Sequence, residues 1–194
     1  MLYDALIKNI SSSISLSAEE LDIFLSMLEC RTIARGAYLL EKGTICRHDH
    51  YISRGLVKVC YLDDAGRENI IKFAPEDWWV VDLDSFLNSK PAFYFIQAIE
   101  ETEVFQLSRA AHDRLHSLIP QFHIFSNMRW QNGFIALQHR VMQGLSLPAE
   151  ERYQQFLQKY PGLDQRISQK LIASYLGITP VFLSMLRRKW AHLS

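Results

Sequence analysis

The stretch Gln169–Arg188, QKLIASYLGITPVFLSMLRR, decides the architecture of this 194-residue chain. Gly177 supplies the left-handed backbone that ends one helix. Thr179 caps the next helix, and Pro180 fits its first turn. Apolar residues at helical spacing provide the inner faces of both helices: Ile172, Leu176, Leu183 and Leu186. The stretch therefore predicts two short helices joined by a tight turn, the helix-turn-helix arrangement.

Charge is balanced over the whole chain, with 21 Lys and Arg against 21 Asp and Glu, but it is unevenly distributed. The segment Asp164–Ser194 has a formal charge of +4, so residues 1–163 carry −4. A basic segment on an acidic body favours contact with phosphates, and we expect the helix-turn-helix to bind double-stranded DNA. The residues expected to contact DNA are Ser168, Gln169, Thr179, Pro180, Val181, Ser184, Arg187, Arg188 and Lys189.

Composition limits the class of protein further. The three cysteines, Cys30, Cys46 and Cys60, are odd in number and widely spaced, which predicts reduced thiols. The chain has no signal-peptide pattern and no apolar run near the about 20 residues of a membrane span. We therefore expect a cytoplasmic protein without a membrane segment. Catalytic residues, a metal and a cofactor are not expected, so the protein is predicted not to be an enzyme.

Residues 32–108 alternate short apolar stretches with turns. Val57, Val59 and Tyr61 alternate with Lys58 and Cys60, which is the period of a half-buried strand. Turns that recur every ~8–12 residues predict an antiparallel β-roll or sandwich. Helical patterns flank this region on both sides, so the fold class is α+β.

A long helix is expected from about Pro120 to Gly144. Its apolar stripe is Phe125, Met128, Ile135, Leu137 and Val141. The stripe packs either against its own copy in a symmetric homodimer or against the chain's own roll, and we favour the homodimer. The predicted domains are a β-roll sensor domain at 1–119, a dimerisation helix at 120–144 and a helix-turn-helix domain at 145–194.

The chain as a whole resembles the CRP/FNR family of bacterial transcription regulators. The resemblance rests on the helix-turn-helix, on Glu41-Lys42-Gly43, on the segment Tyr51–Val59 and on Ala98–Val104. It implies a jelly-roll of the cyclic-nucleotide-binding type, a dimerisation helix and a C-terminal winged helix-turn-helix. It also implies a homodimer that regulates transcription in response to a signal in the roll.

The segment that binds cyclic nucleotides in this family differs here. The Gly-Glu pair is missing from Trp78–Leu83, and the family's arginine and hydroxyl positions hold Ala92 and Phe93. A buried phosphate would lack a cation, so we do not expect cAMP or cGMP as the effector. The aromatic residues there either fill the old pocket or form a site for an apolar small molecule. This candidate ligand pocket consists of Trp78, Trp79, Ala92, Phe93 and Tyr94.

Other interpretations exist for the histidine pairs and for the second helix of the helix-turn-helix. The pairs His48/His50 and His112/His116 could each bind a metal, but surface histidines are the favoured interpretation. A cupin-type metalloenzyme is the second function class, although the glutamate of a cupin motif is missing after His50. Family members often place arginine and glutamate where Pro180, Val181 and Met185 stand here. A third class is therefore a ligand-binding module that has lost specific DNA binding.

Overall fold

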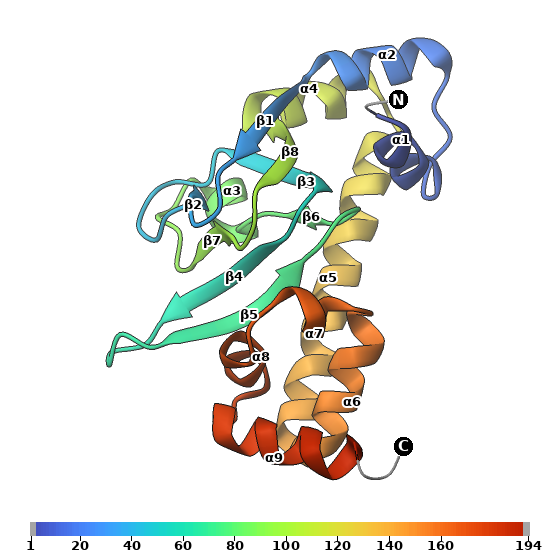
Figure 1. Ribbon diagram of the computed structural model, residues 1–194. Helices are drawn as coiled ribbons and strands as arrows, with labels where there is room; N and C mark the ends of the chain where they lie inside the picture. The colour runs from blue at the N-terminus through green and yellow to red at the C-terminus, as the bar shows by residue number, and fades with distance from the viewer. Residues whose placement is uncertain (1–2, 192–194) are drawn as a thin grey trace. The chain divides into compact units, whose positions relative to one another are not determined.

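The computed structural model describes residues 3–191 (Figure 1). The chain forms two compact units, each assembled from two segments. Unit 1 comprises Met1–Tyr61 and Lys72–Asn132, and unit 2 comprises Leu62–Ile71 and Gly133–Ser194. This division differs from the predicted domains, because one long helix is shared between the units and a short internal segment belongs to unit 2.

Secondary structure follows the expected order of helix, strands and helix. The strands are β1 (Leu28–Ile33), β2 (Tyr38–Leu40), β3 (His48–Arg54), β4 (Val57–Leu62), β5 (Glu68–Ala74), β6 (Trp79–Val80), β7 (Phe95–Ala98) and β8 (Thr102–Ser108). The helices are α1 (Asp4–Ser11), α2 (Ala18–Ser26), α3 (Leu83–Asn88), α4 (Arg109–Leu118), α5 (Phe122–Ser146), α6 (Ala149–Lys159), α7 (Leu163–Arg166), α8 (Gln169–Leu176) and α9 (Pro180–Ala191).

The strands form two four-stranded sheets, ordered β1-β8-β3-β6 and β2-β7-β4-β5. The pairings β1–β8, β3–β8, β3–β6, β2–β7 and β4–β7 are antiparallel. Gly55, between β3 and β4, has a φ of +101°, and a Cβ there would lie 2.6 Å from the Thr102 hydroxyl of β8. Only glycine allows β8 to approach this closely. The predicted antiparallel roll is confirmed.

One face of β3 and β8 is covered by helices of unit 1. Tyr51 and Phe105 are fully buried there with Leu6 and Ile10 of α1. Phe125, at the start of α5, is also fully buried in this cluster. It was expected in the dimer stripe, and this prediction is wrong, since the first turns of α5 cover the roll before the helix becomes exposed.

The described elements of unit 2 after α5 are helices only. Tyr153 and Phe156 of α6 are buried together with Leu163 of α7. The expected β-hairpin wing of the helix-turn-helix does not occur between α5 and Ala191, which corrects that part of the prediction. The physical reason is that Leu183–Ala191 contains no glycine or proline and continues as helix to the end of the described chain.

Two of the four paired histidines are not surface residues. His50 and His112 are 1% and 2% exposed, while His48 and His116 are half-buried. The expectation of surface histidines is therefore wrong for His50 and His112, because strand β3 and helix α4 turn these positions inward. Among the described residues, no single helix is long and apolar enough to cross a membrane. The pair α8 and α9 meets a length and composition criterion only when taken together across its bend.

Candidate nucleic-acid interface

Local capping builds the pair α8 and α9. The Ser168 hydroxyl accepts a hydrogen bond from the backbone N–H of Leu171 at 3.4 Å and begins α8. Gly177 ends that helix with a φ of +67°. The Thr179 hydroxyl accepts from the Phe182 N–H at 3.2 Å and begins α9. The two helices are bent by 99° relative to each other, within the range of a helix-turn-helix, so the predicted motif is present.

The buried side of this pair leaves one face of α9 open. Ile172, Ala173 and Leu183 are fully buried between the helices. Val181 and Met185 are 72% and 60% exposed, and one helical turn separates them. Such a face offers methyl groups and a thioether, which can contact thymine methyl groups but cannot form the bidentate hydrogen bonds that arginine forms with guanine.

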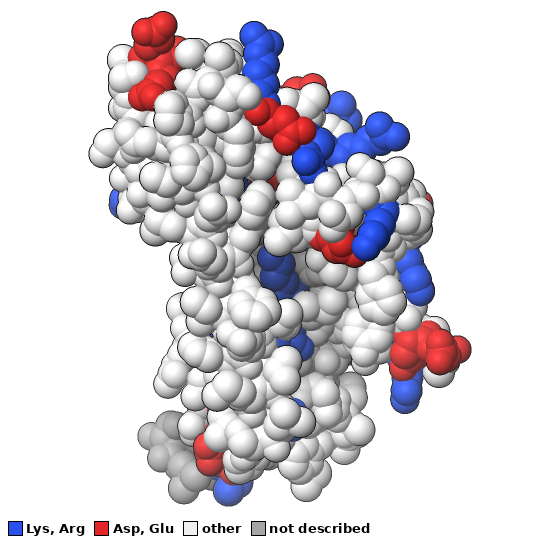
Figure 2. Space-filling view, turned by 180° about the vertical axis from the view of Figure 1, so that it is seen from behind, with Lys and Arg blue, Asp and Glu red and all other residues white. Residues whose placement is uncertain are grey.

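Two of the three basic side chains at the end of α9 lie close to acidic side chains. The Arg187 guanidinium lies 3.8 Å from the Asp164 carboxylate, and the Lys189 ammonium lies 3.3 Å from that of Glu150. Arg188 is exposed and forms no ion pair with a described residue. On the face drawn in Figure 2, positive and negative side chains are interspersed. Arg188, one turn beyond Met185, is therefore the cation best placed for a phosphate contact.

The other predicted DNA contacts also lie on α8 and α9. Ser168 and Gln169 are exposed at the N-terminus of α8, and Thr179 and Pro180 are exposed at that of α9. Ser184 is half-buried beside the open face of α9. The structure therefore brings these residues together in one unit. Helix N-termini attract phosphates through their free N–H groups.

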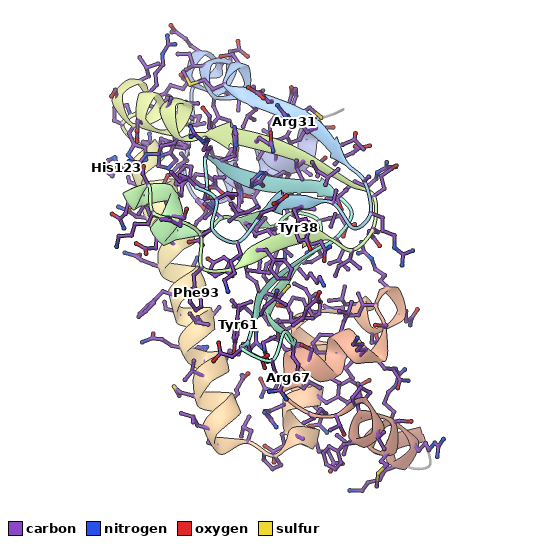
Figure 3. The ribbon with its side chains drawn as sticks, turned by 90° about the vertical axis from the view of Figure 1, so that its left-hand side faces the viewer. Arg31, Tyr38, Tyr61, Arg67, Phe93 and His123 are labelled. Carbon is purple, nitrogen blue, oxygen red and sulfur yellow. The ribbon has the colours of Figure 1, made fainter. Side chains whose placement is uncertain are left out.

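The predicted aromatic ligand pocket does not assemble. Trp79 packs on the helical side of the roll, with ring centroids 5.4 Å from Tyr51 and 5.9 Å from Phe125. Phe93 is 70% exposed and stacks on Tyr61, as Figure 3 shows. These residues are close in sequence but point to different surroundings.

The other residues of that predicted pocket are at least partly buried in the fold. Trp78 is half-buried, and the Tyr94 hydroxyl donates to the Val81 carbonyl at 3.4 Å. Ala92 is buried, and its N–H donates to the Thr44 carbonyl at 2.7 Å. Burial raises the pKa of the Tyr94 hydroxyl. The backbone around Ala92 is thus tied to a neighbouring loop, where a cyclic-nucleotide binder would present its arginine.

Comparisons with known proteins agree with this architecture. Residues 30–117 match the family model of the cyclic nucleotide-binding domain. The global regulator CLP of Xanthomonas campestris is 15% identical, with a TM-score of 0.73, over 91% of this chain and 92% of that one. FixK2 of Bradyrhizobium japonicum is 17% identical, with a TM-score of 0.70, over 86% of this chain and 85% of that one.

A third structure carries the family name. It is assigned as a transcriptional regulator of the crp/fnr family from Eubacterium rectale, with 15% identity and a TM-score of 0.71 over 91% of this chain and 84% of that one. The chain has the CRP/FNR fold. The resemblance predicted from the sequence is confirmed at the level of domain and fold. Among curated protein sequences, none matches the chain significantly.

Within this CRP/FNR fold, a buried ion pair joins the roll to the long helix. The Arg129 guanidinium of α5 donates to the Asp49 carboxylate of β3 at 2.8 Å. Arg129 also lies over the Trp79 ring, 4.0 Å from its centroid. Burial raises the pKa of the fully buried Asp49 carboxyl, and the Arg129 charge opposes that shift. The sequence offered no signal for this pair, because its members are 80 residues apart.

A second link of this kind lies in unit 2. The Arg140 guanidinium of α5 donates to the carbonyls of Ile70, in β5, and Tyr175, in α8, at 2.7 and 2.8 Å. It also stacks on the Tyr175 ring at 3.9 Å. The Ser174 hydroxyl donates to the Glu68 carbonyl at 2.7 Å and accepts from the Ile70 N–H at 3.3 Å. The first helix of the motif is thereby fastened to the β4–β5 hairpin tip. Sequence reasoning missed these residues.

Proposed function

We propose that the protein is a DNA-binding transcription regulator that acts as a homodimer and is controlled by a small-molecule effector in the β-roll. The observation that carries this proposal is the helix pair bent by 99°, with an open α9 face, in a chain that also has a cyclic nucleotide-binding-type domain. We place the protein in the cytoplasm, where its DNA would be, and assign it no enzymatic activity.

Exposed apolar side chains on α5 support the homodimer. Ile135 and Met142 are 46% and 61% exposed, and they are seven residues apart, as in the seam of a coiled coil. The full exposed set is Ile124, Met128, Phe134, Ile135, Leu137, Val141, Met142 and Leu145. A symmetric contact between two α5 helices would remove this surface from water.

An effector other than cAMP fits the roll better. A cyclic phosphate needs a buried cation, and the position that holds the arginine in cyclic-nucleotide binders is occupied here by the uncharged Ala92. The nearby Lys90 ammonium lies 3.7 Å from the Asp84 carboxylate, and both side chains are exposed. CLP is named as responsive to c-di-GMP, but the residues here give no reason to transfer that ligand.

The two arginine links suggest how a signal would travel. A shift of β3 would act on α5 through Asp49 and Arg129. A shift of the hairpin tip would act on α8 through Arg140. In a homodimer, either change would reset the spacing of two α9 helices, which must lie about 34 Å apart to enter successive major grooves.

One observation favours a second candidate function. The open face of α9 has Val181 and Met185 in its centre, and among the described residues of this helix Arg188 is the exposed cation without an ion pair. A ligand-binding module that has lost specific DNA binding would have such a face.

Salt-dependent binding separates the two functions. Fluorescence anisotropy of the full chain on random duplex DNA, titrated with salt, should give binding that falls steeply as salt rises, because phosphate contacts release counterions. If binding is absent at low salt in the presence and absence of candidate effectors, the second function is correct.

A further inference from the structure

Unit 1 contains a pocket of about 250 Å³, whose lining includes Thr44, the residue that accepts a hydrogen bond from the Ala92 N–H. It is formed by β2, the following loop and the start of β3. Its wall includes Tyr38, Leu40, Glu41, Arg47, His48 and His50. Tyr38, labelled in Figure 3, marks the β2 side of this pocket. None of the predicted aromatic ligand residues lines it.

His50 is the unexplained group in this wall. Its side chain is 1% exposed, and neither ring nitrogen has a hydrogen-bond partner among the described residues. The Val80 carbonyl lies near enough to favour the protonated ring slightly, without forming a hydrogen bond of good geometry. Buried polar groups are nearly always paired, so a ring with two unpaired nitrogens beside a cavity points to a bound species.

His48 stands beside His50 on the same face of β3. Residues two apart on a strand point to the same side, and the two ring centroids are 6.1 Å apart. Asp49, between them, points to the other face and contacts Arg129. Burial lowers the pKa of both imidazoles, that of His50 to about 3.

We propose that His48 and His50 form a two-histidine site for a late first-row divalent metal ion such as Cu²⁺, Ni²⁺ or Zn²⁺. Metal–nitrogen bonds of about 2.0–2.1 Å bring two ring centres to roughly 5 Å in tetrahedral geometry, so side-chain rotation must close the gap by about 1 Å. Imidazole ligands suit these metals.

The protein supplies only two ligands. No group of three His, Cys, Asp or Glu side chains in the described chain is arranged to hold a metal, so Glu41 is not a third ligand. Water or a small molecule in the pocket would fill the remaining positions, as in metal sites that keep an open position. The charges of Glu41 and Arg47 on the rim cancel, so the rim neither strongly attracts nor repels the ion.

Cu²⁺ alone, added to the full chain freed of metal by a chelator, tests the site without DNA. Cu²⁺ is the appropriate probe because it binds nitrogen ligands most tightly among these ions. Electron paramagnetic resonance should show coupling to two imidazole nitrogens. His48→Gln, at a half-buried position that should tolerate the change, should weaken binding at least about 100-fold, because even outer-shell changes cost 10–100-fold.

A matched control is available in the other histidine pair. His112 and His116 of α4 both approach the Ser126 hydroxyl, at 3.3 and 3.4 Å, and could bind the same ion. His116→Gln should leave the His48-dependent signal unchanged. Absence of Cu²⁺ binding, or binding that His116→Gln abolishes and His48→Gln does not, would overturn the proposal and leave water as the partner of His50.

Discussion

Replacement of Arg129 by methionine should be among the most destabilising single changes in unit 1. The variant keeps a long apolar side chain against Trp79 but removes the cation that faces Asp49. The Asp49 carboxylate is fully buried, and it accepts a hydrogen bond from the Arg129 guanidinium at 2.8 Å. Removing one partner of a buried ion pair leaves an uncompensated charge and costs about 3–5 kcal/mol.

The pH dependence of this loss has a definite sign. Burial already raises the pKa of Asp49 above its ordinary value of 3.8, and Arg129 opposes the shift. Without Arg129 the pKa rises further. A carboxyl with a raised pKa in the folded state contributes stability at low pH and loses it as pH rises through that pKa. The deficit of Arg129→Met should therefore be largest at pH 7 and shrink as the pH falls towards 4.

Urea denaturation, followed by circular dichroism at pH 7 and pH 4.5, measures the free energy of unfolding of each variant. The double variant Asp49→Asn/Arg129→Met should recover most of the loss, because neither buried charge remains. Arg31→Met is the matched control: its partner Glu29 lies 3.5 Å away, both side chains are about 60% exposed, and such surface pairs contribute about 0–1 kcal/mol. A loss below about 1 kcal/mol for Arg129→Met, or a double variant as unstable as the single one, would refute the reasoning.

Three further predictions concern the interface, the dimer and α4. Arg188→Ala should weaken binding to random duplex DNA and lower the salt slope by about 1, whereas Arg187→Ala should do less because Asp164 holds that side chain; equal effects in anisotropy titrations would contradict this. Met142→Glu should convert the homodimer to a monomer in light scattering, and a surviving dimer would place the contact elsewhere. Burial lowers the pKa of His112 to about 4, so its contribution to stability should decline as pH falls from 6.5 towards 4. Nuclear magnetic resonance titration of that ring should find no protonation near pH 6.5, and a midpoint there would be the contrary result.

Local signals explain why the helix-turn-helix could be predicted from sequence. Gly177, Thr179 and Pro180 act on their immediate neighbours, and the structure has the left-handed glycine and the threonine cap at these positions. The roll was predictable for a similar reason, since alternation and turns are properties of short segments. Family resemblance supplied the jelly-roll architecture, which local patterns do not specify.

Side-chain partners that are distant in sequence explain what could not be predicted. Arg187 and Lys189 contributed to a basic cluster in the sequence, yet their acidic neighbours come from α7 and α6. Trp79 and Phe93 are close in the chain, but β6 places the tryptophan against α5 while the phenylalanine remains exposed. His50 is polar and was therefore expected at the surface, although β3 turns it into the roll.

The Arg140 link has a consequence for how this protein can be divided. Its acceptors come from β5 and α8, 70 and 35 residues away in the chain, so the C-terminal helices do not form a self-contained cassette. A fragment that starts at Gly133 would lack the Ile70 carbonyl that Arg140 binds and the Glu68 carbonyl that Ser174 binds. A chimaera that exchanges the helix-turn-helix domains of two such proteins would therefore need to transfer residues 62–71 together with the helices. Recombination that moved the helices alone would leave the buried Arg140 guanidinium with only one of its two carbonyl acceptors, that of Tyr175.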